Sequence, residues 1–262
     1  MSCSGSGLRC APPVRCKTQA IAQGAQNMTE GGSDEVHMTH QDIGQGQHAL
    51  LHASERSETV RILAFHGGGG VAGSPEMLTP FCTMLVAGSA ICVASASYRT
   101  LNRDKASIEQ MFEDAVRALD WAKRTAPAGT RLFVMGASFG GLLALHAVYG
   151  KPEGVDGLIL LNAVTDISAG GFSNRVVPER GLSHYSPLQL WRDWSGAERL
   201  RVLLAHGRED DVVLASDSER FKDALPRGTA ELLLFDGGSH GFFNRPPHME
   251  RVATRVREFV AG

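Results

Sequence analysis

The sequence predicts an α/β fold, in which a mostly parallel central sheet carries helices on both faces and a short cap insertion. Short, continuous apolar runs of strand length alternate along the chain with amphipathic helical patterns, which is typical of parallel strands buried on both faces. One of these runs ends at a single serine between glycines, and a helical pattern follows at once. With 262 residues, 43% of them hydrophobic and 21% charged, the chain is long enough to bury one large core.

The first stretch of the chain, residues 1–32, is rich in Ser, Gly, Ala and Gln and has no acidic residue before Glu30. This composition predicts a disordered leader, so we expect the folded domain to span residues 33–262. The leader lacks the apolar segment that a secretory signal needs. We therefore expect a cytoplasmic protein, or an organellar one if residues 1–30 act as a transit peptide.

Residues 35–54 alternate weakly between apolar and polar side chains, which predicts two short edge strands. Four histidines lie in this stretch, and they share no face at metal-ligand spacing. We expect all four at surface strand positions, with no metal site: His37, His40, His48 and His52.

A buried strand at residues 60–65, VRILAF, runs directly into the glycine-rich loop at residues 66–70. A helix start follows at Ser74, because this serine is an N-cap residue and is followed by a proline and an acid in the first turn. The next strand covers residues 91–94. After it, a capping box and one continuous apolar face predict a long helix at about residues 107–125.

The strand at residues 132–135 ends in G-A-S-F-G at residues 136–140, and an apolar helical pattern follows. A strand that turns at once into a helix strains the central residue and projects its side chain outward, while flanking glycines let the neighbouring backbones approach closely. The N-terminal N–H groups of the following helix then point at whatever binds beside the serine. We predict that Ser138 is a catalytic nucleophile.

The alternation of strands and helices lapses at about residues 167–198, which are rich in Gly, Ser, Arg and aromatic residues and predict a cap insertion. Regular elements are expected on both sides of it. These are strands at residues 158–161, 202–205 and 232–235, a helix at residues 216–225, and a last helix with Met249, Val252, Val256 and Phe259 on its apolar face.

A nucleophilic serine needs a base within hydrogen-bond reach and an acid that orients the base. Loops at the carboxyl ends of parallel strands meet at one edge of the sheet, so both groups should come from downstream loops there. His240 lies in such a loop, directly after the last strand, and is the predicted base. Packing, surface or substrate-contact roles are expected for the other downstream histidines: His146, His184, His206 and His248.

The predicted acid is Asp210, which lies in HGREDDVV just past the penultimate strand. Two alternatives stay open, its neighbour Asp211 and Asp166, which follows the preceding strand. Asp236 is expected to cap or turn its own loop.

A tetrahedral intermediate also needs donors for its oxyanion. The backbone N–H of Phe139 and those of Gly67 and Gly68 are the predicted donors, and His66 is expected to brace the glycine loop. Aromatic side chains of the cap and of the last loop are expected to line an apolar substrate site: Tyr185, Trp191, Trp194 and Phe242.

Five motifs occur in order over about residues 60–260: HGGGG, SYR, GASFGG, HGREDDVV and GSHGFF. With these motifs the chain resembles the α/β-hydrolase fold, nearest the esterases of the hormone-sensitive-lipase and acetyl-esterase groups. The resemblance implies a carboxylesterase that acts through an acyl-enzyme, with Ser138 as nucleophile, Asp210 as acid and His240 as base. It also implies a structural role for the pair Tyr98 and Arg99.

The chain departs from the hormone-sensitive-lipase pattern at three positions. That pattern has an acidic residue before the serine and an alanine after it, where this chain has Ala137 and Phe139. Ser97 replaces the usual Asp before Tyr-Arg, and the cap before the first strands is short or absent. These differences concern the subfamily and the substrate rather than the triad.

Other functions compete for the same residues. The glycines at residues 68–73 also fit the G-x-G-x-x-G pattern of a dinucleotide loop, but Ser74 indicates a helix that starts after the glycines, and the serine turn would then have no use. A non-enzymatic receptor with this fold stays open, as do thioesterase, formamidase, peptidase and lyase activities that use the same triad.

The charge and hydrophobicity of the chain limit the classes of molecule that it is expected to bind. Lys+Arg 26 against Asp+Glu 28 gives a net charge of -2 with no dense basic run, so we expect no nucleic-acid partner. No apolar segment approaches the roughly 18 residues of a membrane span. We expect a small-molecule ester with a short acyl or an aromatic group, and no cofactor or metal. The oligomeric state does not follow from the sequence.

Five cysteines are present. Cys82 and Cys92 lie in apolar patterns and are expected to be reduced core residues, while Cys3, Cys10 and Cys16 lack the C-x-x-C spacing of a zinc site.

Overall fold

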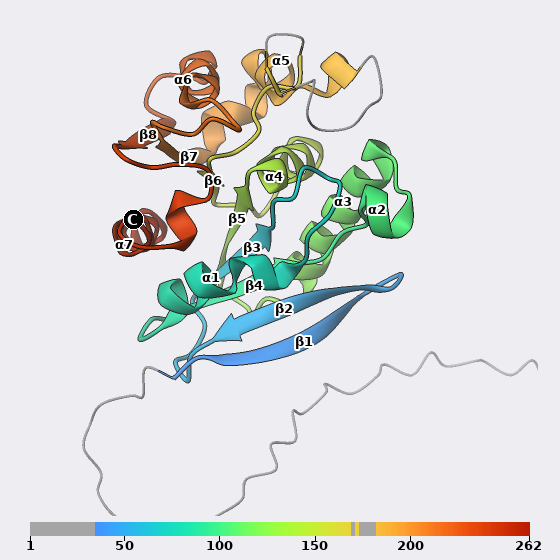
Figure 1. The fold of residues 1–262 in the computed structure, drawn as a ribbon. Helices are drawn as coiled ribbons and strands as arrows, with labels where there is room; N and C mark the ends of the chain where they lie inside the picture. The colour runs from blue at the N-terminus through green and yellow to red at the C-terminus, as the bar shows by residue number, and fades with distance from the viewer. Residues whose placement is uncertain (1–34, 169–170, 173–181) are drawn as a thin grey trace, which may run out of the picture. The chain divides into compact units, whose positions relative to one another are not determined.

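An eight-stranded sheet with the strand order β1-β2-β4-β3-β5-β6-β7-β8 forms the centre of the structure, a computed structural model (Figure 1). All neighbours from β4 to β8 pair in parallel, whereas β1 and β2 add an antiparallel hairpin to β4. The predicted mostly parallel α/β sheet is therefore confirmed. The strands are β1 His37–Gly44, β2 Gln47–Ala53, β3 Val60–Phe65, β4 Ile91–Ala96, β5 Arg131–Ala137, β6 Gly157–Leu161, β7 Arg201–Gly207 and β8 Ala230–Phe235.

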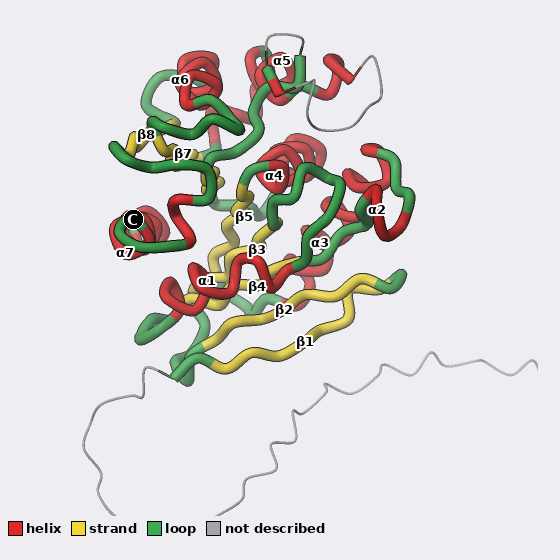
Figure 2. The backbone as a smooth tube through the Cα atoms, viewed as in Figure 1, coloured by secondary structure: helices red, strands yellow, loops and turns green. Residues whose placement is uncertain are grey.

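Helices flank both sides of the strands (Figure 2). The α-helices are α1 Thr79–Val86, α2 Leu101–Asp104, α3 Ile108–Thr125, α4 Phe139–Gly150, α5 Pro187–Arg192, α6 Ala215–Ala224 and α7 Met249–Ala261. The 3₁₀ helices are η1 Pro75–Leu78, η3 Leu182–Tyr185, η4 Ser195–Arg199 and η5 Phe242–Asn244.

Alternating side chains of the strands build one hydrophobic core on each face of the sheet. In β3, Leu63 and Phe65 pack into the core formed with α3 and α4. Ile62 and Ala64 point the other way, into the core formed with α1 and α7. Every residue of β3 is buried, which explains why its sequence is apolar at every position except Arg61.

Two local predictions about helix starts are also confirmed. The Ser107 hydroxyl accepts the N–H of Gln110 at 3.4 Å, and the Gln110 side chain accepts the N–H of Ser107 at 3.0 Å, so α3 begins with the expected capping box. After the glycine loop the first helical turn begins at Pro75, beyond the glycines.

The expectation of two edge strands was wrong for β2, which pairs with β1 on one side and with β4 on the other. His52 is buried rather than at the surface because α1 covers this face of β2, and its ring lies 3.4 Å from the hydroxyl of Thr79 in α1. The weak alternation of this stretch could not show that β4 would pair with the outer edge of β2.

The structure describes residues 35–168, 171–172 and 182–262. The predicted leader, with Cys3, Cys10 and Cys16, lies outside the described residues, as does the middle of the predicted cap at residues 167–198. Cys82 and Cys92 are both buried free thiols. Within the described ranges, every helix is too short or too polar to cross a bilayer.

Candidate active site

The serine predicted as nucleophile occupies the sharp turn between β5 and α4. Ser138 has φ +52° and ψ −122°, a strained backbone that places it between Ala137, the last strand residue, and Phe139, the first helical one. A Cβ on Gly136 would lie 2.3 Å from the carbonyl oxygen of Gly140, and a Cβ on Gly140 would lie 2.1 Å from that of Phe65. Only glycine fits these two positions, which is the physical reason why glycines flank Ser138 in the pattern G-x-S-x-G.

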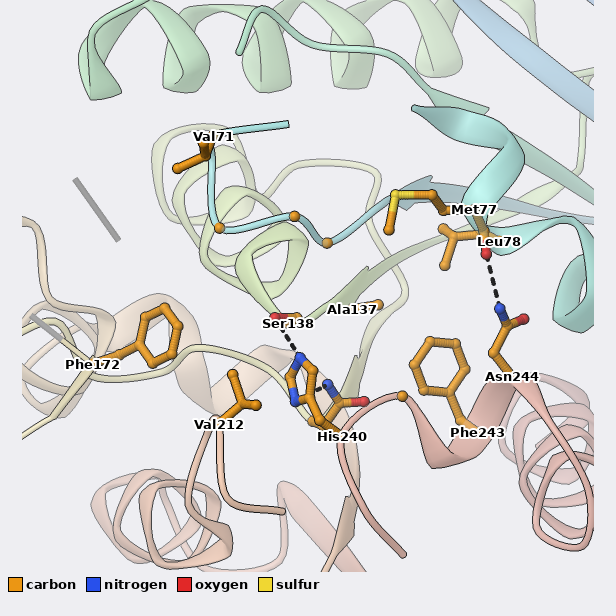
Figure 3. A pocket seen from close by; sticks show the side chains of 15 residues that line it. Val71, Met77, Leu78, Ala137, Ser138, Phe172, Val212, His240, Phe243 and Asn244 are labelled. Carbon is orange, nitrogen blue, oxygen red and sulfur yellow. Dashed lines mark hydrogen bonds between the residues drawn. The ribbon is translucent and has the colours of Figure 1, made fainter. Parts of the chain in front are cut away.

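His240 joins the serine to an acid. Its loop follows β8, and its Nε2 lies 3.1 Å from the Ser138 hydroxyl oxygen (Figure 3). Its Nδ1 lies 2.8 Å from a carboxylate oxygen of Asp210. With the proton on Nδ1, the imidazole donates to Asp210 and accepts from the Ser138 hydroxyl, as a general base must.

Asp210 lies 3% exposed at the end of β7. Burial by itself would raise the pKa of this carboxyl, but interactions with the nearby His206 ring, 3.5 Å away, with His240 and with the Val213 amide outweigh it. The pKa is therefore held well below its usual range. The Val212 and Val213 N–H groups donate to one carboxylate oxygen at 2.9 and 3.0 Å, which fixes the other toward His240.

The alternative acids are placed differently. Asp166 is buried, and it accepts hydrogen bonds from the Ser168 N–H and the Ser186 hydroxyl and pairs with Arg220 at 3.3 Å. Among the described residues it has no bond to His240. Asp211 is exposed at the surface of its loop, and Asp236 is 89% exposed at its side chain and pairs with Arg208.

The glycine loop after β3 passes directly beside the serine. A Cβ on Gly67 would lie 3.2 Å from the Cβ of Ser138, so the loop backbone approaches the serine closely. The N–H groups of Gly67, Gly68 and Phe139 donate to no other described residue. Gly67 and Gly68 also line the cavity at Ser138, where an oxyanion would form.

Two aromatic rings brace this loop. The Tyr98 hydroxyl lies 3.0 Å from the carbonyl oxygens of both His66 and Gly67, and the Tyr98 and His66 rings stack at 4.3 Å. Burial lowers the pKa of His66 to about 4, so its ring is neutral at pH 7, and it lies 2.7 Å from the Gly67 carbonyl oxygen. Arg99 pairs at 2.7 Å with Asp114, whose side chain is fully buried. The Tyr98 and His66 contacts anchor the glycine loop, and the Arg99 pair ties the segment after β4 to α3.

A cavity of about 530 Å³ opens above Ser138. Figure 3 shows Phe172 and Val212 on one side of the His240 ring, and Met77, Leu78 and Phe243 on the other. The remaining lining comes mainly from the glycine loop and the His240 loop. Ser138 thus lies between two small apolar regions, in a space typical of small-molecule sites.

The four aromatic residues expected to line this site do not line the described cavity. Trp191 and Phe242 are 1% exposed and belong to the cores on opposite faces of the sheet. Trp194 packs on Tyr149 and Trp191, and Tyr185 packs on Phe112 and donates its hydroxyl to Glu109 at 3.1 Å. Phe172 and Phe243 supply aromatic lining in their place. Composition could not separate core aromatic residues from pocket ones.

Asn162 is a site residue that the sequence reasoning missed. It directly follows β6, takes φ +38°, and places its amide nitrogen 3.2 Å from Nδ1 of His240. Its side-chain oxygen is buried and has no partner among the described residues. A polar residue immediately after a buried strand, beside the strand that carries the serine, was the available signal.

The other downstream histidines lie apart from the serine. His146 of α4 stacks on Phe112 of α3, with the ring centroids 3.6 Å apart, and burial lowers the pKa of His146 to about 4. His206 is fully buried, between the Ser218 hydroxyl and the Val213 carbonyl. His184 lies in η3, and His248 packs against Phe235 and Phe242.

Comparisons with known proteins agree with this architecture. A protein-family model described as the alpha/beta hydrolase fold matches residues 62–244, more than half of the chain. An uncharacterized protein of Salmonella typhimurium, YfhR, is 27% identical over 145 residues, which are 51% of this chain and 49% of that protein. The match thus spans about half the length of this curated relative.

Solved structures of esterase 2 from Thermogutta terrifontis have the same fold. The form phosphoramylated by tabun has a TM-score of 0.71 and 22% identity, and the match covers 86% of this chain and 94% of that one. The butyrate-bound form has a TM-score of 0.67 and 21% identity, covering 86% and 93%. At these identities the similarity concerns the fold alone.

Proposed function

Because the chain belongs to the family of the alpha/beta hydrolase fold, we propose that it is a serine hydrolase of carboxylic esters. The observation that carries the proposal is the continuous hydrogen-bonded line from Ser138 through His240 to Asp210, at 3.1 and 2.8 Å, on the wall of an open cavity. Esterase activity of the structurally similar Thermogutta protein supports the same reaction class.

The reaction follows from the positions of the protons. His240 Nε2 takes the hydroxyl proton as the Ser138 oxygen attacks the ester carbonyl carbon, and the imidazolium is stabilised by Asp210. The N–H groups of Gly67, Gly68 and Phe139 receive the oxyanion. His240 then gives its proton to the departing alcohol, which leaves an acyl-serine. Water attacks this ester by the same steps in the second half of the reaction.

The cavity supports a short acyl chain or an aromatic ester as substrate. Its two apolar regions lie on either side of His240, so one can receive the acyl group and the other the alcohol group. A volume of about 530 Å³ lies within the range of sites for small molecules and is too small to enclose a long-chain triglyceride.

Hydrolysis of a chain-length series of p-nitrophenyl esters tests the proposal. We expect turnover to be highest for short acyl chains, and Ser138→Ala to lower kcat by at least about 10⁴-fold because the nucleophile is lost. Ser216→Ala is the matched control, since Ser216 is exposed on α6, and it should keep the parent's rate.

Other outcomes identify the competing functions. Turnover of thioesters, formamides or peptides in place of esters, again lost in Ser138→Ala, would indicate a different acyl hydrolase with the same triad. A folded parent that hydrolyses none of these compounds, and whose Ser138 does not react with a fluorophosphonate, would contradict the proposal and favour a receptor.

A further inference from the structure

Three metal-ligating side chains converge on the hairpin side of the molecule: His40 of β1, His48 of β2 and Glu76 of η1. One donor atom from each lies within 4.8 Å of the other two. Among the described residues this is the one group of three or more His, Cys, Asp or Glu side chains with such spacing. It includes no residue of the Ser138 site.

The strand register explains why the two histidines meet. In the antiparallel pair β1–β2, His40 lies opposite Leu50 and Asp42 lies opposite His48, so the two histidines are diagonal neighbours on one face. Their ring centroids lie 5.2 Å apart. The expectation that these histidines share no face was wrong, because spacing along one chain does not give the register between two strands.

The carboxylate reaches the same face because η1 lies against the sheet. The Ser95 hydroxyl of β4 donates to the Pro75 carbonyl at 3.1 Å, and the Asn244 amide donates to the Met77 carbonyl at 2.8 Å. Glu76 lies between these two anchored residues. Its backbone is therefore held in place beside the hairpin.

His48 is also held by its backbone. Its N–H donates to the Ser97 hydroxyl at 2.9 Å, and its carbonyl accepts the Ser97 N–H at 2.8 Å. The side chain of His48 is half-buried, whereas those of His40 and Glu76 are exposed. The backbone of His48 is thus fixed, and the exposed side chains of His40 and Glu76 can adjust by rotation.

We propose that His40, His48 and Glu76 form a binding site for a divalent transition-metal ion of the zinc class. Neutral imidazole nitrogens with one carboxylate oxygen are donors that Zn²⁺ prefers, and a site with three protein ligands leaves a fourth position for water. No ion pair joins Glu76 to either imidazole within the described structure.

The geometry needs only a small adjustment. Bonds of about 2.0–2.1 Å in a tetrahedral zinc site put neighbouring donor atoms about 3.3 Å apart. The donor atoms here lie within 4.8 Å, so each approaches its neighbours by up to about 1.5 Å, which rotation of the exposed His40 and Glu76 side chains supplies.

A bound ion would link the hairpin to the cavity at Ser138. Met77 and Leu78 directly follow Glu76 and line that cavity. The ion would therefore hold one wall of the cavity to β1 and β2, without taking part in the reaction.

Calorimetric titration of the full chain with Zn²⁺ tests the site. To remove competing thiols, every protein carries Cys3→Ser, Cys10→Ser and Cys16→Ser. We expect His48→Ala to weaken the binding of one equivalent of zinc by at least about tenfold, because one of three ligands is lost. His37→Ala is the matched control, since His37 is exposed on β1 outside the cluster, and it should bind like the parent.

Thermal unfolding gives a second readout that does not depend on activity. Zinc at 100 times its Kd should raise the Tm of the parent and of His37→Ala by about 5 °C, and should not raise that of His48→Ala or Glu76→Gln. Comparing each variant with and without zinc separates loss of binding from loss of stability. Equal zinc affinity and equal Tm shifts in all four proteins would overturn the proposal.

Discussion

Asp210 and Asp166 are both buried carboxylates that follow strands at the same edge of the sheet, yet their partners differ. Asp210 accepts from His240 at 2.8 Å, whereas Asp166 is occupied by Ser186, by the Ser168 amide and by Arg220. In the proposed triad, Asp210 therefore keeps the imidazole in the tautomer that accepts the serine proton.

We expect Asp210→Asn to lower kcat for a p-nitrophenyl ester by about 10⁴-fold, because an amide at this position favours the wrong tautomer. Asp166→Asn is isosteric in the same way and should keep kcat within about tenfold, since Asp166 does not contact His240. Steady-state kinetics of both variants decide between the acids. The reverse ranking would assign the role to Asp166.

Asn162 also lies within hydrogen-bond distance of the His240 imidazole. His240 Nδ1 carries a proton when it donates to Asp210, so the amide group facing it should be the acceptor oxygen rather than the nitrogen. Turning the Asn162 amide end for end places that oxygen at 3.2 Å from Nδ1. We therefore expect Asn162 to be a positioning residue that helps hold the imidazole.

Asn162→Asp should move the acid limb of the kcat/KM profile to higher pH, by about one pH unit, because a second carboxylate beside the ring favours its protonated form. The free base is then lost at a higher pH as the solution is acidified. Asp tolerates the φ of +38° nearly as well as Asn does. A pH–rate profile with an unshifted acid limb would show that Asn162 does not interact with the imidazole.

The close contact between α4 and β3 holds Ser138 beside the glycine loop. Gly140→Ala puts a methyl group 2.1 Å from the Phe65 carbonyl oxygen, so the helix must move away from the strand. We expect a loss of about 2–4 kcal/mol in the free energy of unfolding, measured in urea, together with lower turnover.

Gly150→Ala is the control within the same helix. A Cβ there meets nothing within 4 Å, so the change should be neutral or stabilise by up to about 1 kcal/mol. Equal stability of the two variants would mean that α4 does not depend on this contact.

The sequence predicted those elements whose fold is decided locally. β3 was expected at its observed bounds, and the start of α3 followed from Ser107 and Gln110, because apolar runs and capping boxes act within a few residues. Features that depend on distant partners were not predicted well. The inner position of β2 needs β4, and the buried position of Trp191 needs α6, whose Phe221 it contacts.

The residues of the proposed site also fall into two groups, those that the sequence identified and those that it did not. Ser138 and His240 could be identified because each occupies a local turn whose geometry the glycines reveal. Asn162 and Phe172 reach the cavity only through the parallel packing of β5 and β6 and the path of the chain after β6. The sequence marks Asn162 only as a polar residue at the end of a buried strand, and it gives no signal that Phe172 would reach the cavity.

For the molecule as a whole, buried neutral histidines make stability depend on pH. Burial lowers the pKa of His66 and of His146 to about 4, and it also lowers that of His52. In an unfolded chain these groups titrate near about 6.5. Their contribution is fully present above that pH and is lost as the pH falls toward 4, because the unfolded chain then binds more protons.

We therefore expect the free energy of unfolding to fall between pH 7.5 and pH 5, by about 1.4 kcal/mol per pH unit below pH 6.5 for each of His66 and His146. Urea unfolding at several pH values measures this slope. His146→Phe keeps a ring against Phe112 and should give a shallower slope. An unchanged slope in that variant would contradict the assignment for His146.

The strand order has a consequence for the newly made chain. From β5 outward, strands β6, β7 and β8 join the sheet in the order in which the ribosome makes them, so each can add to an edge that already exists. The loop that carries His240 comes after the last of them. A nascent chain stalled before β8 would thus present the apolar edge of β7, which is prone to aggregate, and would carry Ser138 without the proposed base His240.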